Sequence, residues 1–292
     1  LRVTPGEITF TAIWKDKTNP TLSIRYEKDD GSVYPLNTWT KATVTAIATG
    51  KDLGSGIAGI KWDDGEYIPE NPSKKKFDTS GIYFGRVYTK DKADVPDSTY
   101  ETVPANEVSI PYGKVMIDKT NPIGEISYGY TVDGTLEWFD NAETPTRNNV
   151  TVKITAKDEH SGLANTAYSW DHGKTWVSSN TKVLSENIDD YVWVRDKVGN
   201  IAKFPYSVSG IDKKKPTVEP VDPPKPDPDS PGNQESYDED GTLIYDWVKR
   251  NVLLKFKAED KPSDDPAYAA SGVKEIRLYS AKAVGSTFTK GS

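Results

Sequence analysis

The sequence predicts an all-β protein made of tandem β-sandwiches in an elongated array. Short alternating segments rich in Val, Thr, Ile and Tyr are separated by Gly and Pro, which is typical of half-buried strands. No long stretch shows the 3.6-residue apolar period of a helix. The string Asp-Lys-Thr-Asn-Pro stands at 16–20 and 118–122, and a near copy stands at 212–216. Repetition at domain length indicates one folding unit copied in tandem.

The repeated string divides the chain into five predicted parts. Apolar residues alternate with polar ones before the first string, which predicts a strand that ends a preceding module. Seven prolines between 216 and 231 favour an extended spacer over a central strand. The last copy is expected to be partial, because it stops before a closing hairpin. The predicted parts are a lead-in strand at 1–15, module 1 at 16–117, module 2 at 118–211, a proline-rich spacer at 212–236 and a partial module 3 at 237–292.

Four signals follow the string in the same order in each copy. The first is an Asp-Gly turn, at Asp30, Asp133 and Asp240, which indicates a hairpin. An alternating strand comes next, then an aspartate followed by Ser-Gly, and then a further strand. The predicted strand pairs are 42–48 and 57–62, 150–156 and 163–170, and 252–258 and 273–279.

A closing hairpin is predicted after these signals in the first two copies. In the second copy it has strands at 191–195 and 206–211, joined by the turn Asp-Lys-Val-Gly-Asn at 196–200. In the first copy it has strands at 82–88 and 114–117, with a longer connection between them. Seven short strands in each 95 to 105 residues are typical of a β-sandwich.

These ordered motifs resemble the bacterial Ig-like modules that are strung along cell-surface and secreted proteins. The resemblance rests on Asp-Lys-x-x-Pro, Asp…Ser-Gly, Trp-Asp-x-Gly and Asp-x-x-Gly-Asn, and it covers residues 16–292. It implies tandem Ig-like sandwiches that act as stalks, spacers or adhesive tips. Separately, Thr9-Phe10-Thr11-Ala12-Ile13-Trp14 resembles the end of a surface repeat from Listeria and Bacteroides.

Composition narrows the function classes. The net charge of -7 and pI of 5.1 argue against nucleic-acid binding, which needs a basic face. No apolar run reaches the ~20 residues of a membrane-spanning helix. The absence of cysteine excludes disulfides, thiolate metal sites and a cysteine nucleophile. With only two histidines and no convergent set of catalytic groups, we expect no enzyme activity.

Calcium is the one cofactor that the sequence suggests. Aspartates near turns should meet at one end of each module, and clustered carboxylates with backbone carbonyls are ligands that calcium prefers. The alternative is that each aspartate caps its own turn, since no compact Asp-x-Asp-x-Asp loop is present. The candidates form two sets, with Asp52, Asp91 and Asp118 assigned to module 1 and Asp158, Asp196 and Asp212 assigned to module 2.

Three further features have a structural and a functional interpretation. Trp39, Trp138 and Trp247 are candidate carbohydrate contacts, although sandwich cores also use tryptophan. The segment 169–176 matches the Asp-box of sialidases, but we expect a hairpin in which the aspartate caps the turn and Trp176 packs beneath it. Lys153, Asn200 and Glu159 are a candidate set for an intramolecular isopeptide bond.

These observations together predict a non-catalytic stalk or spacer segment of a bacterial cell-surface or secreted protein, with adhesive contacts to a host or surface protein or glycan. The segment is expected to be monomeric, extracellular or cell-wall attached, not inserted in a membrane and not bound to nucleic acid. The alternative is a carbohydrate-binding accessory region of a multimodular glycoside hydrolase.

Overall fold

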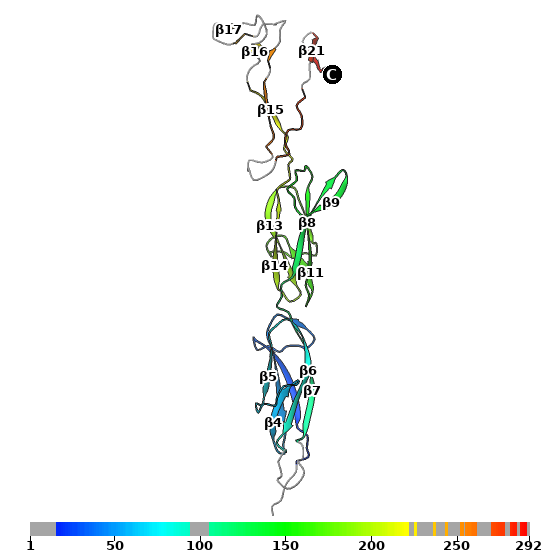
Figure 1. Ribbon diagram of the computed structural model, residues 1–292, viewed down its shortest axis with the longest axis vertical. Coiled ribbons are helices and arrows are strands. Elements are labelled where there is room, and N and C mark those ends of the chain that lie inside the picture. Colours follow the sequence, from blue (N-terminus) through cyan, green and yellow to red (C-terminus); the bar gives the residue numbers. More distant parts are fainter. Residues whose placement is uncertain are drawn as a thin grey trace, which may run out of the picture. The chain divides into compact units, whose positions relative to one another are not determined.

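The computed structural model describes residues 16–93, 105–221, 255–261 and 270–277, together with the backbone of six short strands between 225 and 290. Every regular element in this part of the chain is a strand, which confirms the predicted all-β class (Figure 1). Among the described residues, no helix has the length and apolar character needed to cross a membrane. The predicted lead-in strand at 1–15 lies outside the described residues.

Contacts divide the chain into two compact units. The first contains residues 1–124, 156–178 and 193–204, and the second contains 125–155, 179–192 and 205–292. The module boundaries predicted from the repeated string stay a prediction.

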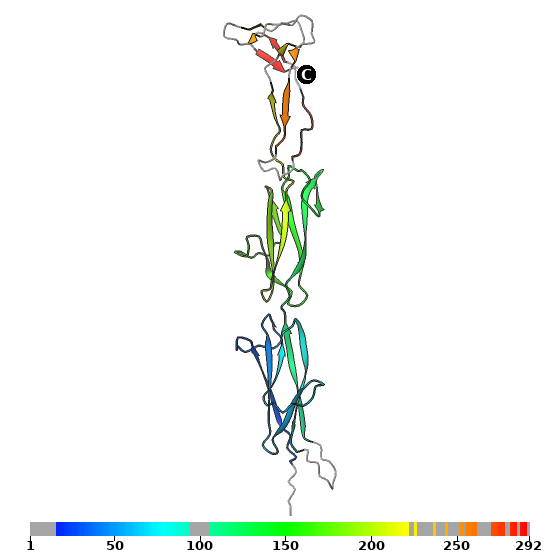
Figure 2. The same ribbon diagram turned by 60° about the vertical axis from the view of Figure 1, so that its left-hand side comes forward.

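The first unit contains a pair of sheets formed by β1 to β7, which can be followed from two sides in Figure 1 and Figure 2. One sheet has the strand order β1-β3-β5, and the other has the order β2-β7-β6-β4. All pairs are antiparallel except β2 with β7. The strands are β1 (Thr21–Lys28), β2 (Trp39–Thr40), β3 (Val44–Lys51), β4 (Ile57–Trp62), β5 (Ser73–Phe77), β6 (Gly81–Asp91) and β7 (Glu107–Ile117).

A hydrophobic core joins these two sheets. Val44 and Phe77 of the first sheet pack in one cluster with Val115 and Ile117 of the second, and all four are buried. Alternation explains the arrangement, because every second residue of a strand faces the same side of its sheet. Full burial of each such side chain contributes about 1.5–3 kcal/mol. The first unit is therefore consistent with a β-sandwich.

Two further sheets follow along the chain. One has the order β12-β10-β8-β9 and the other has the order β11-β13-β14. The strands are β8 (Ile123–Val132), β9 (Thr135–Phe139), β10 (Val150–Lys157), β11 (Leu163–Ser169), β12 (Thr181–Leu184), β13 (Ile188–Asp196) and β14 (Ile201–Val208). Buried Val and Ile residues again alternate along single strands, at Val150, Val152 and Ile154 of β10 and at Val192 and Val194 of β13.

The predicted Asp-Gly turns are formed where the structure describes them. Asp133 and Gly134 both have positive φ, at 46° and 83°, and they join β8 to β9 in a two-residue hairpin. Gly31 has a φ of 79° at the first such turn. The third turn, at Asp240, lies outside the described residues.

The last part of the chain differs from the sequence prediction. The predicted strand at 252–258 is β19 (Val252–Leu253) and β20 (Phe256–Glu259), while 273–277 is described without a strand. The predicted spacer at 212–236 contains β15 (Thr217–Pro220), which pairs with β20, and β16 (Lys225–Pro226), which pairs with β19. Two-stranded ladders leave the outer edge of each strand unpaired, so they tolerate proline. The remaining strands are β17 (Ser236–Tyr237), β18 (Leu243–Ile244), β21 (Ala281–Val284) and β22 (Thr287–Lys290).

Candidate metal-binding aspartate clusters

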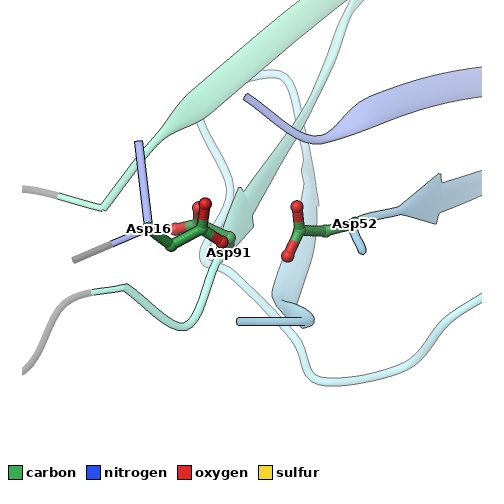
Figure 3. Close-up of side chains that lie close together, drawn as sticks. All are labelled: Asp16, Asp52 and Asp91. Carbon is green, nitrogen blue, oxygen red and sulfur yellow. The ribbon is translucent and has the colours of Figure 1, made fainter. Parts of the chain in front are cut away.

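Two groups of three aspartates lie in the first unit. Asp16, Asp52 and Asp91 form the first cluster, and each offers a carboxylate oxygen within 4.8 Å of the others. Figure 3 shows these carboxyl groups turned toward one another from three segments of the chain. The second cluster, Asp118, Asp158 and Asp196, meets the same distance limit.

Strand direction explains why three distant aspartates meet. Asp16 precedes β1, whereas Asp52 follows β3 and Asp91 ends β6. Because β1 and β3 are antiparallel, the start of β1 lies beside the end of β3, where Thr21 pairs with Lys51. The second cluster repeats this order, with one aspartate before β8, one after β10 and one at the end of β13.

The clusters correct the grouping expected from the sequence. Asp118 meets Asp158 and Asp196 instead of Asp52 and Asp91, and Asp16 completes the first cluster. The aspartate of each repeated string therefore joins the loops that follow it. The physical reason is that Asp118 directly precedes β8, the first strand of the next sheets, and so lies beside the ends of β10 and β13. Asp16 was detectable in principle, since it stands in the same string as Asp118.

The third copy forms part of the same arrangement in the second unit. Asp212 Oδ2 accepts a hydrogen bond from the Ser271 N–H at 3.0 Å. Asp260 Oδ2 accepts a hydrogen bond from the Ser271 hydroxyl at 2.9 Å. Asp212, like Asp118, thus bonds the loop that follows it and does not join Asp158 and Asp196.

The aspartate of each string makes the same bonds in both complete clusters. Asp118 Oδ1 accepts hydrogen bonds from the Thr120 N–H at 3.0 Å and the Thr120 hydroxyl at 2.8 Å. Asp118 Oδ2 accepts one from the Ser161 N–H at 3.0 Å. Asp16 accepts the matching bonds from Thr18 and Ser55, with the Thr18 N–H at 2.9 Å and the Ser55 N–H at 2.7 Å.

An asparagine beside each cluster was missed by the sequence analysis. The side-chain amide of Asn200 donates to Asp196 Oδ2 at 2.6 Å and to the Asp118 backbone oxygen at 3.1 Å. Asn106 makes the same two bonds, to Asp91 at 2.7 Å and to the Asp16 backbone oxygen at 3.1 Å. Asn200 follows its aspartate within one tight turn, whereas Asn106 follows Asp91 after a long connection, so no common spacing marks the pair.

The remaining aspartates cap turns. Asp52 Oδ2 accepts a hydrogen bond from the Gly56 N–H at 2.6 Å, and Asp158 Oδ1 accepts one from the Gly162 N–H at 2.7 Å. Asp196 Oδ1 accepts bonds from three successive backbone N–H groups, at 198 to 200. These three carboxylates therefore make the turn-capping hydrogen bonds that the sequence analysis gave as the alternative to calcium binding.

Burial and hydrogen bonding act in opposite directions on these carboxylates. Burial raises the pKa of Asp118, but hydrogen bonds from Ser161 and Thr120 outweigh it, so its pKa lies below the usual value. Burial raises the pKa of Asp196 above the usual value, and the negative charge of Asp118 adds to that rise. Hydrogen bonds from Thr18 lower the pKa of Asp16. The second cluster thus holds one carboxylate that favours ionisation beside one that resists it.

Three buried side-chain oxygens in the described residues lack a hydrogen-bond partner: two belong to the serines beside the two clusters, and the third belongs to Asp260 of the third copy. They are Ser55 Oγ, Ser161 Oγ and Asp260 Oδ1. Ser161 is only 4% exposed and its N–H is bonded to Asp118. An unsatisfied buried oxygen beside two or three carboxylates adds to an all-oxygen donor set, which fits a hard cation such as calcium and no soft metal.

The two candidate tryptophans that the structure describes lie in different units. Trp39 is half-buried in the first unit and meets the His160 ring edge-on, with centroids 5.9 Å apart. Trp138 is 43% exposed in the second unit, where the Lys153 ammonium lies 5.0 Å from its ring centroid. Trp247 lies outside the described residues. The isopeptide candidates are engaged elsewhere, since Lys153 lies over Trp138 and the Asn200 amide is bonded to Asp196.

The segment that matches the Asp-box forms the expected capped turn. Asp171 accepts hydrogen bonds from the Thr175 N–H at 2.8 Å and its hydroxyl at 2.6 Å, and Gly173 has a φ of 84°. The hydroxyl and N–H of Thr175 lower the pKa of Asp171 to about 2. Trp193 is the ring beside Gly173, and Trp176 lies under the Arg195 guanidinium, so the packing of Trp176 beneath the turn stays a prediction.

Comparison with family models, curated proteins and solved structures finds no match to this chain.

Proposed function

We propose that this chain is a non-catalytic stalk or spacer segment of a secreted or wall-attached bacterial protein, built from tandem Ig-like sandwiches. The observation that carries the proposal is the bonding of the repeated string. Its aspartate bonds the residues that follow, and its lysine bonds the residues that precede. A short connection bonded on both sides restricts bending, which is what a spacer requires.

The string at 118–122 illustrates this arrangement. Asp118 bonds forward to Ser161 through its carboxylate. Lys119 bonds backward, because its ammonium donates to the Thr43 hydroxyl at 2.9 Å and its N–H donates to Ser80 Oγ at 2.9 Å. The Asp118 N–H donates to the Thr40 carbonyl at 2.9 Å. Four hydrogen bonds thus hold these two neighbouring residues, one from the chain that follows and three from the chain that precedes.

The string at 212–216 repeats this arrangement in the second unit. Asp212 bonds forward to the Ser271 N–H. The Lys213 ammonium bonds backward, to Asn149 Oδ1 at 2.7 Å and the Ser185 carbonyl at 2.9 Å. The Asp212 N–H donates to the Thr146 carbonyl at 2.8 Å, as Asp118 does to Thr40. At both strings the aspartate carboxylate bonds residues that follow and the lysine ammonium bonds residues that precede. This recurrence supports the proposal that the string joins two modules and does more than form a local turn.

Calcium would strengthen such a junction. The proposal is that each complete cluster binds one calcium ion through its three carboxylates, with the buried serine hydroxyl beside it. The competing account is that the hydrogen bonds described above already satisfy the carboxylates as turn caps. Calcium titration of the chelator-treated protein separates the two accounts, because only a metal site gives heat of binding and a higher melting temperature.

Small-angle scattering tests the spacer proposal. A rigid array predicts one maximum dimension that does not change with added neutral polymer. The double variant D118A/K119A should give a smaller radius of gyration, since both directions of bonding at one string are removed. The matched control D78A/K76A removes an exposed ion pair with 3.6 Å between Asp78 Oδ2 and Lys76 Nζ. Equal scattering from both variants would contradict a junction role for the string.

Carbohydrate binding by the three candidate tryptophans stays a prediction. In the described residues, His160 lies edge-on to Trp39, and the Lys153 ammonium lies over the ring of Trp138. The spacer proposal places the protein outside the cell, as a monomer without membrane insertion. The absence of any binding on a glycan array would count against the accessory-region alternative.

A further inference from the structure

A pocket of about 340 Å³ lies in the second unit, beside β8, β13 and β14. Three tyrosines line it, together with two neighbouring aspartates of β13. Its volume lies near the lower end of the range for small-ligand sites, about 300–1,000 Å³. The lining residues are Tyr128, Asp189, Asp190, Tyr191, Tyr206 and the Pro205-Ser207 flanks of the last tyrosine.

The base of the pocket is fixed by hydrogen bonds. Tyr206 is buried, and its hydroxyl donates to Asp190 Oδ2 at 3.2 Å. The Lys182 ammonium donates to the same hydroxyl oxygen at 3.3 Å. The Asp190 carboxylate and the Lys182 ammonium therefore both contact the Tyr206 hydroxyl. Tyr128 is also held, because its hydroxyl oxygen accepts the Ser207 N–H at 3.1 Å.

The rim of the pocket offers groups that a ligand can use. Tyr191 is 50% exposed. Asp189 is exposed and has no hydrogen bond or ion pair with any residue that the structure describes. No lysine or arginine lines the pocket. The pocket thus combines the Asp189 carboxylate with the exposed Tyr191 ring, while the Lys182 ammonium is bonded to the Tyr206 hydroxyl.

We propose that this pocket binds a primary ammonium group carried on a compact ring or alkyl chain. A cation is attracted to the face of an aromatic ring, by about 0.5–1 kcal/mol at an exposed site. A carboxylate adds a charge-assisted hydrogen bond to the same group. Asp189 and Tyr191 stand two residues apart on β13, so both side chains project from one side of the strand. Two sources carry this chemistry, an amino sugar and a lysine side chain.

Backbone NMR of the full chain tests the proposal with defined probes. Glucosamine and Nα-acetyl-lysine methylamide represent the two sources, and N-acetylglucosamine is the neutral match to glucosamine. We expect one or both amines to shift the amide signals of 189–191 and 206–207 at millimolar concentration, and the neutral sugar to shift them at least fivefold less. The amine that binds identifies the source.

Three variants connect the binding to named groups. D189N should weaken amine binding about fivefold, the upper range for one exposed ion pair. Y191A should weaken it by a similar factor, through loss of the ring face. The control E137Q makes the same charge change at an exposed residue of β9 outside the pocket, and should leave the affinity unchanged. All three side chains are exposed, so the fold should be kept, and dispersion of the amide spectrum checks this.

Several results would overturn the proposal. It fails if neither amine shifts the pocket signals, or if N-acetylglucosamine binds as well as glucosamine. It also fails if D189N and E137Q weaken the amines equally, because the effect would then reflect net charge alone.

Discussion

Removal of the Asp118 carboxylate tests how the repeated string stabilises the chain. The change D118A deletes the acceptor for the Ser161 N–H, the Thr120 N–H and the Thr120 hydroxyl. Asp118 is 0% exposed and Ser161 is 4% exposed, so water cannot replace the carboxylate at Ser161 without a rearrangement.

The expected loss follows from these contacts. A buried N–H left without a partner costs about 1–3 kcal/mol, and a part-buried hydrogen bond such as those of Thr120 contributes about 1 kcal/mol. Relief of repulsion with Asp158 and Asp196 offsets part of this loss. The lowered pKa of Asp118 shows that the fold favours its ionised form despite that repulsion. The net destabilisation should therefore be about 2 kcal/mol, or roughly 4–8 °C in melting temperature for a unit as large as the first one.

Urea unfolding followed by tryptophan fluorescence measures the loss, and hydrogen exchange at the Ser161 amide locates it. The D78A control loses only an exposed ion pair, worth at most about 1 kcal/mol. The reasoning is refuted if D118A and D78A have the same urea midpoint while the Ser161 amide stays protected.

Three further predictions concern other parts of the described structure. Asp171 should titrate near its lowered pKa of about 2, so its contribution to stability is complete above about pH 4 and is lost as the pH falls toward 2; a carboxyl NMR midpoint near 4, unchanged in T175V, would refute this. Calcium should raise the melting temperature by an amount that D158A reduces, and an unchanged melting temperature in the parent protein would leave the aspartates as turn caps only. G85A should destabilise the first unit by about 1–3 kcal/mol, because a Cβ there would lie 1.9 Å from Asp63 Oδ1 and 2.6 Å from the Tyr112 hydroxyl. The double variant D63A/G85A should recover part of that loss in urea unfolding, and no difference between G85A and the parent would contradict the predicted clash.

The alternation of apolar and polar residues predicted a strand well where one face of the strand is apolar and the other is polar. The segment 57–62 coincides with β4, and 150–156 is β10 without its last residue. β7 was predicted only at 114–117, although it begins at 107, because Pro111 and Gly113 interrupt the alternating pattern. Pairing with β6 carries the strand through these residues, with a register shift between Tyr83 and Gly85.

A repeated motif does not show which partners its residues have in space. Asp63 and Asp171 both follow a tryptophan in the Trp-Asp-x-Gly pattern. Asp171 caps its own turn through Thr175, whereas Asp63 accepts a hydrogen bond from the Tyr112 hydroxyl at 3.0 Å. Gly85 leaves the space that Asp63 fills. Similarly, spacing along the chain could not show that Asp118 faces the loops that follow it, because that depends on which strand ends lie side by side.

The distance between one residue before the string at 118–122 and one residue after it tests the spacer proposal most directly. The chain contains no cysteine, so V33C and V183C introduce the only two labelling sites, at side chains that are 78% and 63% exposed. Pulsed electron paramagnetic resonance between spin labels at these sites should give one narrow distance distribution, which broadens when D118A and K119A are added. A broad distribution in the otherwise unchanged chain, not altered by those two substitutions, would contradict the account.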